Sequence, residues 1–128
     1  MASTNGAHPR LHCVVHPLLK VHLTRLRDQG TPPSAFRDAL EVASGLLVAA
    51  ALQDLELIDQ PIHTPLQATV GQALARPLAF VPILRAGLGM LAAAQRLAPD
   101  AAVWHLGLYR DEATLQPVTY YSKLPNSE

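Results

Sequence analysis

The run from Phe80 to Met90, FVPILRAGLGM, constrains the fold more than any other segment of the chain. It starts with apolar residues, reaches one arginine at Arg85, and passes Gly87 and Gly89 into an apolar helical pattern. This order predicts a buried strand, a tight turn and a helix. The N–H groups at the start of a helix and an arginine side chain both attract phosphate oxygens. The run therefore indicates an anion site.

The neighbouring segments extend this run into an α/β architecture. Residues 78–84 are continuously apolar, which predicts a strand buried on both faces of a parallel sheet. A helix is predicted over 87–98 and a second buried strand over 101–109, which together make a βαβ unit. Two amphipathic helices are predicted earlier, over 17–28 and from Pro32 or Pro33 to about residue 50, because leucine and other apolar residues recur there at helical spacing.

Further strands are predicted on either side of the βαβ unit. Alternating apolar and polar residues over 55–64 predict a strand, and Thr64-Pro65 a turn that leads to a short return strand near Val70-Gly71. After the second buried strand, charged residues at 110–112 interrupt the chain, and 118–121 predict one more strand in a hairpin-like flap.

Composition bounds the class of protein. The chain has 128 residues, 49% apolar and 16% charged, enough to bury a core in one small domain or part of a larger one. Ten acidic residues balance ten basic ones, which argues against a nucleic-acid partner. The longest apolar run, Leu46 to Leu52, is far shorter than the roughly 20 residues that span a bilayer. With a single cysteine, Cys13, and no visible signal peptide, a cytoplasmic protein without a membrane partner is expected.

Arg110 follows the second strand of the βαβ unit as Arg85 follows the first. Adjacent parallel strands bring their carboxyl ends to one crevice, where ligands bind. The two arginines are therefore expected to face one polyanion. The alternative is that they are solvated charges at the rim, or that Arg110 pairs with Asp111 or Glu112.

Two other interpretations of the glycines stay open. Gly87-x-Gly89-x-x-Ala92 matches a dinucleotide-binding fingerprint, with Asp111 at a suitable distance to hold a ribose. That fingerprint normally lies in the first βαβ unit of its domain, and Arg85 would crowd the pyrophosphate. The glycines could also simply let helix and strand pack closely.

Histidines and helix cations are weaker candidates. His12 and His16 are four residues apart, with His8 and His22 nearby, but Pro17 places His16 before the helix, so surface histidines are favoured over a metal site. Cys13 has no adjacent catalytic residues and is not expected to be a nucleophile. The cations Lys20, Arg25 and Arg27 predict a solvated helix face, with a regulatory anion site as the alternative.

Taken together, the residues resemble the N-terminal portion of the uracil phosphoribosyltransferase family over roughly residues 16–125. The matching segments are HPL at 16–18, LTxLRD at 23–28, FR at 36–37, TPL at 64–66, VPILRAGLGM at 81–90, and GLYRDExTLxPVxYYxKLP at 107–125. The two long segments are specific, whereas the short ones alone would be weak.

The resemblance implies a type I phosphoribosyltransferase-like α/β fold, a Rossmann-like parallel sheet with two N-terminal helices and a flap hairpin. It implies the transfer of 5-phosphoribosyl diphosphate (PRPP) to uracil, giving UMP and diphosphate, with Mg²⁺ accompanying PRPP. The stretch Arg85-Ala86-Gly87 would bind the diphosphate, Arg110 would be a second PRPP arginine, and residues 111–124 would form the flap. No protein residue would act as a nucleophile. A homo-oligomer and activation by GTP are further implications.

The family's acidic pair with its phosphate loop, and its uracil-recognising segment, come after the flap and are not in this sequence. The fold is therefore expected to be incomplete, with residues 1–15 disordered and 16–128 forming the N-terminal part of the domain. Negligible transferase activity is expected of residues 1–128 alone, and a non-catalytic interaction remnant is an alternative role.

Overall fold

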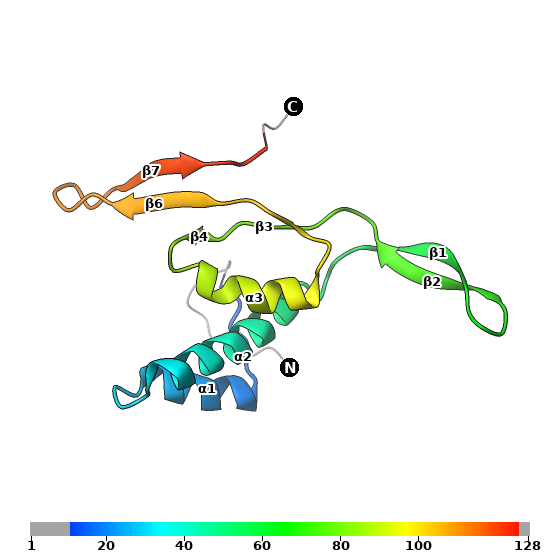
Figure 1. Cartoon of the computed structure of the whole chain (residues 1–128), viewed down its shortest axis with the longest axis horizontal. Helices are drawn as coiled ribbons and strands as arrows, with labels where there is room; N and C mark the ends of the chain where they lie inside the picture. Colours follow the sequence, from blue (N-terminus) through cyan, green and yellow to red (C-terminus); the bar gives the residue numbers. More distant parts are fainter. Residues whose placement is uncertain (1–10, 126–128) are drawn as a thin grey trace.

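A computed structural model of the chain describes residues 11–125, and its element order is two helices, a hairpin, and a βαβ unit that continues into a second hairpin (Figure 1). The helices are α1 (Pro17–Arg27), α2 (Pro33–Ala51) and α3 (Leu88–Leu97). The strands are β1 (Leu57–His63), β2 (Ala68–Leu74), β3 (Ala79–Phe80), β4 (Ile83–Leu84), β5 (Ala102–Val103), β6 (Leu106–Arg110) and β7 (Pro117–Ser122). The predicted α/β class is confirmed.

The helices begin and end where the sequence predicts. Pro17 and Pro33 occupy the first helical positions of α1 and α2, where a missing N–H removes no hydrogen bond. The side chain of His16 accepts a hydrogen bond from the Leu18 N–H at 3.2 Å and so caps α1. This gives His16 a local structural role. Residues 1–10, with most of the predicted disordered segment, lie outside the described residues, and residues 11–16 contain no helix or strand.

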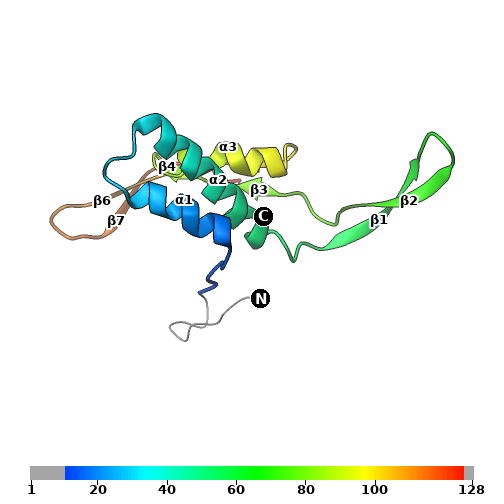
Figure 2. The ribbon, with the colours of Figure 1, turned by 90° about the horizontal axis from the view of Figure 1, so that it is seen from below.

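Small side chains let α2 pack closely between α1 and α3. The buried residues of the three helices are Leu19, Ala39, Ala43, Ser44, Ala93 and Ala94. All but Leu19 are small, so the backbones of α2 and α3 can approach each other, and dispersion contacts accumulate at short range. Figures 1 and 2 show the three helices gathered on one side of the strands. No helix within residues 11–125 is both long and apolar enough to cross a membrane.

The βαβ unit forms with the predicted parallel pairing, but each of its two strands is interrupted. β3 pairs with β5 and β4 with β6, both in parallel, with α3 as the crossover. Pro82 separates β3 from β4 because proline has no N–H to donate to a ladder, although its carbonyl still accepts from Leu106 N–H at 3.3 Å. On the other strand, Trp104 and His105 separate β5 from β6.

The prediction that residues 78–84 are buried on both faces is wrong. Val81 is 44% exposed and Ile83 is 50% exposed, whereas Pro82 between them is buried. Successive side chains of a strand point to opposite faces. In the described chain, the helices therefore cover one face of this parallel pair and leave the other accessible.

Two antiparallel hairpins complete the fold. β1 and β2 pair over seven residues each, from Leu57 opposite Leu74 to His63 opposite Ala68, which confirms the predicted strand and its return. Thr64 closes the turn, since its hydroxyl accepts from the N–H of Gln67 at 3.1 Å. This hairpin projects away from the helices (Figures 1 and 2). β6 and β7 form the second hairpin, where the flap was predicted.

Candidate anion-binding site

The turn between β4 and α3 is short and internally hydrogen-bonded. The N–H of Gly87 donates to the Ile83 carbonyl at 2.8 Å, and that of Leu88 donates to the Arg85 carbonyl at 3.1 Å. The peptide bond between Leu84 and Arg85 is cis. The N–H groups of Gly89 and Met90 are also used in tight turns, at 3.1 and 3.2 Å. The first N–H groups of α3 are therefore engaged by the preceding residues.

Two N–H groups in this turn remain for a ligand. Those of Arg85 and Ala86 donate to no protein group among residues 11–125, and both residues are exposed. An accessible N–H without a protein partner must be satisfied by water or by a ligand. Together with the Arg85 guanidinium, these donors make the local electrostatic potential positive. The turn can therefore bind an anion through its backbone and one side chain together.

Gly87 and Gly89 are required by close contacts and not by unusual backbone angles. Gly87 has φ −60°, and no glycine of the described chain has a positive φ. A Cβ at Gly87 would lie 2.7 Å from both the backbone N and O of Ile83. At Gly89 it would lie 2.8 Å from the Cδ2 of Leu40 on α2. Gly87 therefore sets the shape of the turn between β4 and α3, and Gly89 sets the approach of α3 to α2.

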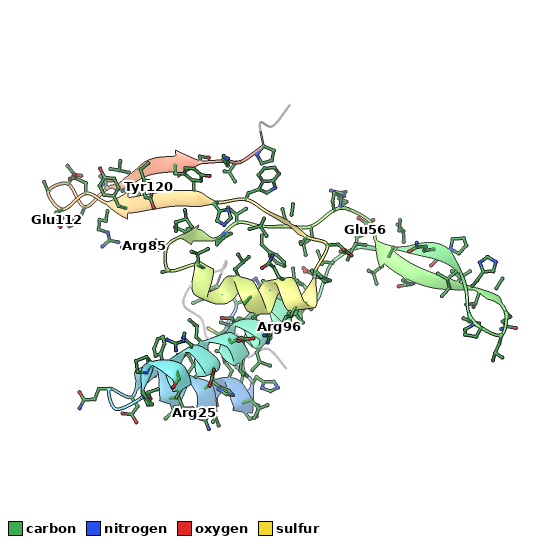
Figure 3. All side chains as sticks on the ribbon, viewed as in Figure 1. Arg25, Glu56, Arg85, Arg96, Glu112 and Tyr120 are labelled. Atoms are coloured by element: carbon green, nitrogen blue, oxygen red, sulfur yellow. The ribbon has the colours of Figure 1, made fainter. Side chains whose placement is uncertain are left out.

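Strand pairing places Arg110 at the same edge of the sheet as Arg85. Leu84 pairs with Gly107 in parallel register, and β6 continues through Arg110. The position of β6 level with Arg85 is two residues before Arg110. At about 3.3 Å per residue, Arg110 therefore lies only about 7 Å further along the strand. The sequence-based expectation that both arginines reach one edge agrees with this register. Figure 3 shows Arg85 on the same side of the molecule as the turn of the β6–β7 hairpin, where Glu112 lies.

Both arginines are available to a ligand. Arg85 and Arg110 are exposed, and neither forms an ion pair within residues 11–125. The salt bridges of that part of the chain are elsewhere, between Arg76 and Glu56 and between Arg96 and Glu41. The alternative that Arg110 pairs with a neighbouring carboxylate finds no support in the described residues.

The carboxylate of Asp111 is used by its own turn. Its Oδ1 accepts from the Thr114 N–H at 2.8 Å, from the Thr114 hydroxyl at 2.8 Å and from the Ala113 N–H at 3.2 Å. These bonds, led by the one from the Thr114 backbone, lower the pKa of Asp111 below its ordinary value of 3.8. The Asp111 carboxylate is therefore already hydrogen-bonded within its own turn, which argues against a role as the ribose ligand of a dinucleotide site.

The donor set at this edge does not suit a resident metal ion. Mg²⁺ prefers oxygen ligands, whereas Arg85 and Arg110 contribute cations and the turn contributes N–H groups. No group of three or more His, Cys, Asp or Glu side chains that could hold a metal occurs within residues 11–125. His8 lies outside the described residues. A cavity of about 680 Å³, lined by Leu52, Leu74, Arg76 and Leu97 among others, lies at the base of the β1–β2 hairpin and not at the arginines.

Sequence reasoning overlooked the hydrogen-bonded turn after β6. Asp111 and Thr114 are three residues apart, a spacing at which aspartate and threonine side chains commonly bond to nearby backbone groups. That signal was available in the sequence. It was obscured because Asp111 also fits the spacing of the dinucleotide fingerprint.

Adjacent parallel strand ends thus bring to one edge two arginines and two N–H groups that have no protein partner in the described part of the chain. This arrangement is typical of phosphate-binding proteins. Comparison with known proteins identifies the particular family. The model of the uracil phosphoribosyltransferase family matches residues 13–128, and the chain belongs to this family. The interpretation of Gly87 and Gly89 as a dinucleotide fingerprint is set aside with it.

Individual relatives agree with the family assignment. The chain is 52% identical over 110 residues to the uracil phosphoribosyltransferase of Roseiflexus castenholzii, covering 86% of this chain and 53% of that protein. It is 46% identical over 114 residues to the one of Salinibacter ruber, covering 89% and 54%. The solved structure of the AQ2163 protein from Aquifex aeolicus superposes with a TM-score of 0.81 at 37% identity, covering 88% of this chain and 54% of that one. The chain thus spans about half the length of the relatives it matches.

Proposed function

We propose that this chain functions in uracil phosphoribosyl transfer. This reaction joins uracil to PRPP and yields UMP and diphosphate in pyrimidine salvage. The observation that carries the proposal is that Arg85 and Arg110, at the ends of adjacent parallel strands, form no ion pair within residues 11–125. Membership in the family supports the identity of the ligand. Arg85 and Ala86 would hold the diphosphate of PRPP, Gly87 would shape the turn that presents them, and Arg110 would be a second cation.

The chemistry of such a transfer suits these donors. The bond between ribose C1 and the diphosphate oxygen breaks, a bond forms between C1 and a ring nitrogen of uracil, and that nitrogen loses its proton. Negative charge accumulates on the departing diphosphate. Fixed N–H groups at Arg85 and Ala86 and the two guanidinium groups would stabilise that charge as it develops. No side chain of the chain needs to attack the sugar.

Magnesium would enter with the substrate. Bound to the diphosphate, Mg²⁺ would neutralise part of the negative charge on the leaving group. The cationic and N–H donors around Arg85 would then bind the remaining phosphate oxygens.

Calorimetric titration tests the proposal directly. With Mg²⁺ present, we expect the chain to bind PRPP and to show no measurable affinity for NAD at the same concentration. Binding of NAD in preference to PRPP would support a dinucleotide-binding module instead. Failure to bind either ligand, together with association with another protein, would support the role of a non-catalytic interaction remnant.

We also propose that the chain forms a homo-oligomer through the β1–β2 hairpin. Ile58 and Ile62 lie on one face of this hairpin and are 52% and 40% exposed. An isolated two-stranded hairpin is only marginally stable in water, so a surface that covers it would stabilise it. A second copy offers the same apolar face, and two such faces can pair about a twofold axis.

Sedimentation velocity measures this association. The wild-type chain is expected to sediment as a dimer or larger species at micromolar concentration. Replacing both isoleucines by serine (I58S with I62S) should shift it to monomer, whereas His63→Ser on the other face should not. A wild-type chain that is monomeric throughout would refute this mode of assembly.

Activation by GTP and a cytoplasmic location are proposed from the family resemblance and from composition. GTP would be an activator, and the exposed cations of α1 offer a surface for its phosphates. The free and exposed thiol of Cys13 is consistent with a reducing, cytoplasmic location.

A further inference from the structure

The turn that follows Arg110 is closed by one side chain. Asp111 Oδ1 accepts from Ala113 N–H, Thr114 N–H and the Thr114 hydroxyl. The Thr114 hydroxyl oxygen in turn accepts from the Gln116 N–H at 3.3 Å. A continuous chain of hydrogen bonds therefore runs from Gln116, at the start of the returning strand, to Asp111, directly after Arg110.

Backbone bonds join the same two ends. The Asp111 N–H donates to the Gln116 carbonyl at 3.0 Å, and the Leu115 N–H donates to the Asp111 carbonyl at 2.9 Å. The next pair along the ladder is Arg110 opposite Pro117. Because Asp111 and Gln116 are hydrogen-bonded partners, Arg110 and Pro117 beside them form a non-hydrogen-bonded pair, and Arg110 itself makes no backbone bond to β7. The Asp111 turn thus supplies much of the restraint on the backbone at Arg110.

The turn also holds a costly backbone conformation. Leu115 has φ +58°, in the left-handed region that a leucine rarely adopts. Such a conformation persists when surrounding bonds determine it. The bonds available to do so are those of Thr114 and Ala113 to the Asp111 side chain and that of the Leu115 N–H to the Asp111 carbonyl, since residues 112–116 are exposed and bury no apolar core.

We propose that Asp111 is a positioning residue for Arg110, so that the closed turn fixes the guanidinium where it meets the diphosphate. The inference rests on the proposed function of Arg110 and adds a residue to it. Asp111 itself does not touch the ligand in this arrangement. Its negative charge lies beside an anion site, and the turn directs the charge-bearing oxygen to Thr114 and Ala113.

Two substitutions at Asp111 separate positioning from charge. Asp111→Asn removes the negative charge but keeps a carbonyl oxygen that can accept the same three hydrogen bonds. Asp111→Ala removes charge and acceptor together. If the residue positions Arg110, alanine should lower PRPP affinity about five- to tenfold, because binding must then order the turn, and asparagine should lower it less than twofold.

Glu112 provides a matched control. It is the adjacent carboxylate, exposed in the same turn, and it makes no side-chain hydrogen bond within residues 11–125. Glu112→Ala should leave PRPP affinity unchanged or slightly raise it. Thr114→Val, which keeps the side-chain shape but removes the hydroxyl, should weaken binding by an amount between those of the alanine and asparagine variants.

A spectroscopic readout follows the turn independently of the ligand. The Thr114 amide proton resonance should titrate with the Asp111 carboxyl and give a pKa below 3.8. Because the folded pKa is depressed, the turn contributes its full stability above that ordinary value and loses it as the pH falls through the folded value. In Asp111→Asn this titration should disappear while the Thr114 resonance keeps its position.

The outcomes distinguish this inference from the function on which it rests. A wild-type chain that fails to bind PRPP refutes the proposed function. A wild-type chain that binds, with Asp111→Ala binding equally well, refutes the positioning role alone. Equal losses in the alanine and asparagine variants would also refute it, because the charge and not the turn would then matter.

Discussion

Arg85→Ala is expected to weaken PRPP binding by about 10- to 100-fold, since hydrogen bonds to charged groups contribute about 1.5–3 kcal/mol. The guanidinium is exposed and forms no ion pair within residues 11–125, so its removal leaves no protein carboxylate unpaired. The loss should therefore appear in ligand affinity and not in stability. Titration calorimetry with PRPP and Mg²⁺, together with thermal unfolding of the same sample, measures both.

Arg110→Ala should weaken PRPP binding by a similar amount. If the two arginines bind one diphosphate, their contributions are coupled, and the double variant should lose less than the sum of the two single losses. Strict additivity would mean that the two cations act on separate ligands or on separate parts of one ligand. A double-mutant cycle in PRPP affinity decides between these results.

Arg76→Ala is the matched control for both variants. Arg76 is exposed at the base of the β1–β2 hairpin, and its side chain lies 4.0 Å from Glu56 in a weak surface pair. Its removal changes net charge by the same amount at a different place. If Arg76→Ala weakened binding as much as Arg85→Ala, a general electrostatic attraction would explain the data and a built site would not.

Local sequence patterns predict the helices and hairpins of this chain well. Proline at the first helical position and apolar residues at helical spacing define α1 and α2 within a residue or two of the observed bounds. The β1–β2 hairpin likewise follows from alternation and from the Thr64-Pro65 turn. These features depend on neighbours close in sequence, so one sequence is enough to find them.

Features that depend on distant partners were harder to predict. Which face of residues 78–84 is covered depends on where α2 and α3 pack, and the apolar run itself does not contain this information. The buried positions of α2 are Ala39, Ala43 and Ser44, whereas the larger apolar side chain of Phe36 on the same helix is 41% exposed. The apolar periodicity includes Ala43, but Ala39 and Ser44 become buried because close helix packing requires small side chains, which a hydrophobicity pattern does not reveal.

The candidate site was predicted at the level of residues but not of atoms. Arg85 and Arg110 follow from the rule that parallel strands end at one edge. Within residues 11–125, the N–H groups of Arg85 and Ala86 lack a protein partner, whereas those at the start of α3 are hydrogen-bonded. The sequence alone does not show this difference, because it depends on the hydrogen bonds of the turn. The sequence also could not show that Gly87 contacts the backbone of Ile83 and that Gly89 contacts a side chain.

That difference between the two glycines leads to the second large effect, at Gly87. In Gly87→Ala the new methyl group would lie 2.7 Å from the backbone N and O of Ile83, neither of which can rotate away. The turn must shift, and the 2.8 Å bond from Gly87 N–H to the Ile83 carbonyl is strained with it. We expect a loss of about 1–3 kcal/mol in the free energy of unfolding. PRPP affinity should fall by at least about tenfold because the anion-binding donors move.

Gly89→Ala makes the same chemical change two residues further on and should have the opposite outcome. Its methyl group would meet only the Cδ2 atom of Leu40 at 2.8 Å, at the end of a side chain that can change rotamer. Alanine also favours the helical conformation of α3 over glycine by about 1 kcal/mol, which offsets the crowding. Stability should change little, and PRPP affinity should stay at the wild-type value. Denaturant unfolding and calorimetry on both variants test the contrast, and equal behaviour of the two would contradict a diphosphate-binding turn whose shape depends on Gly87.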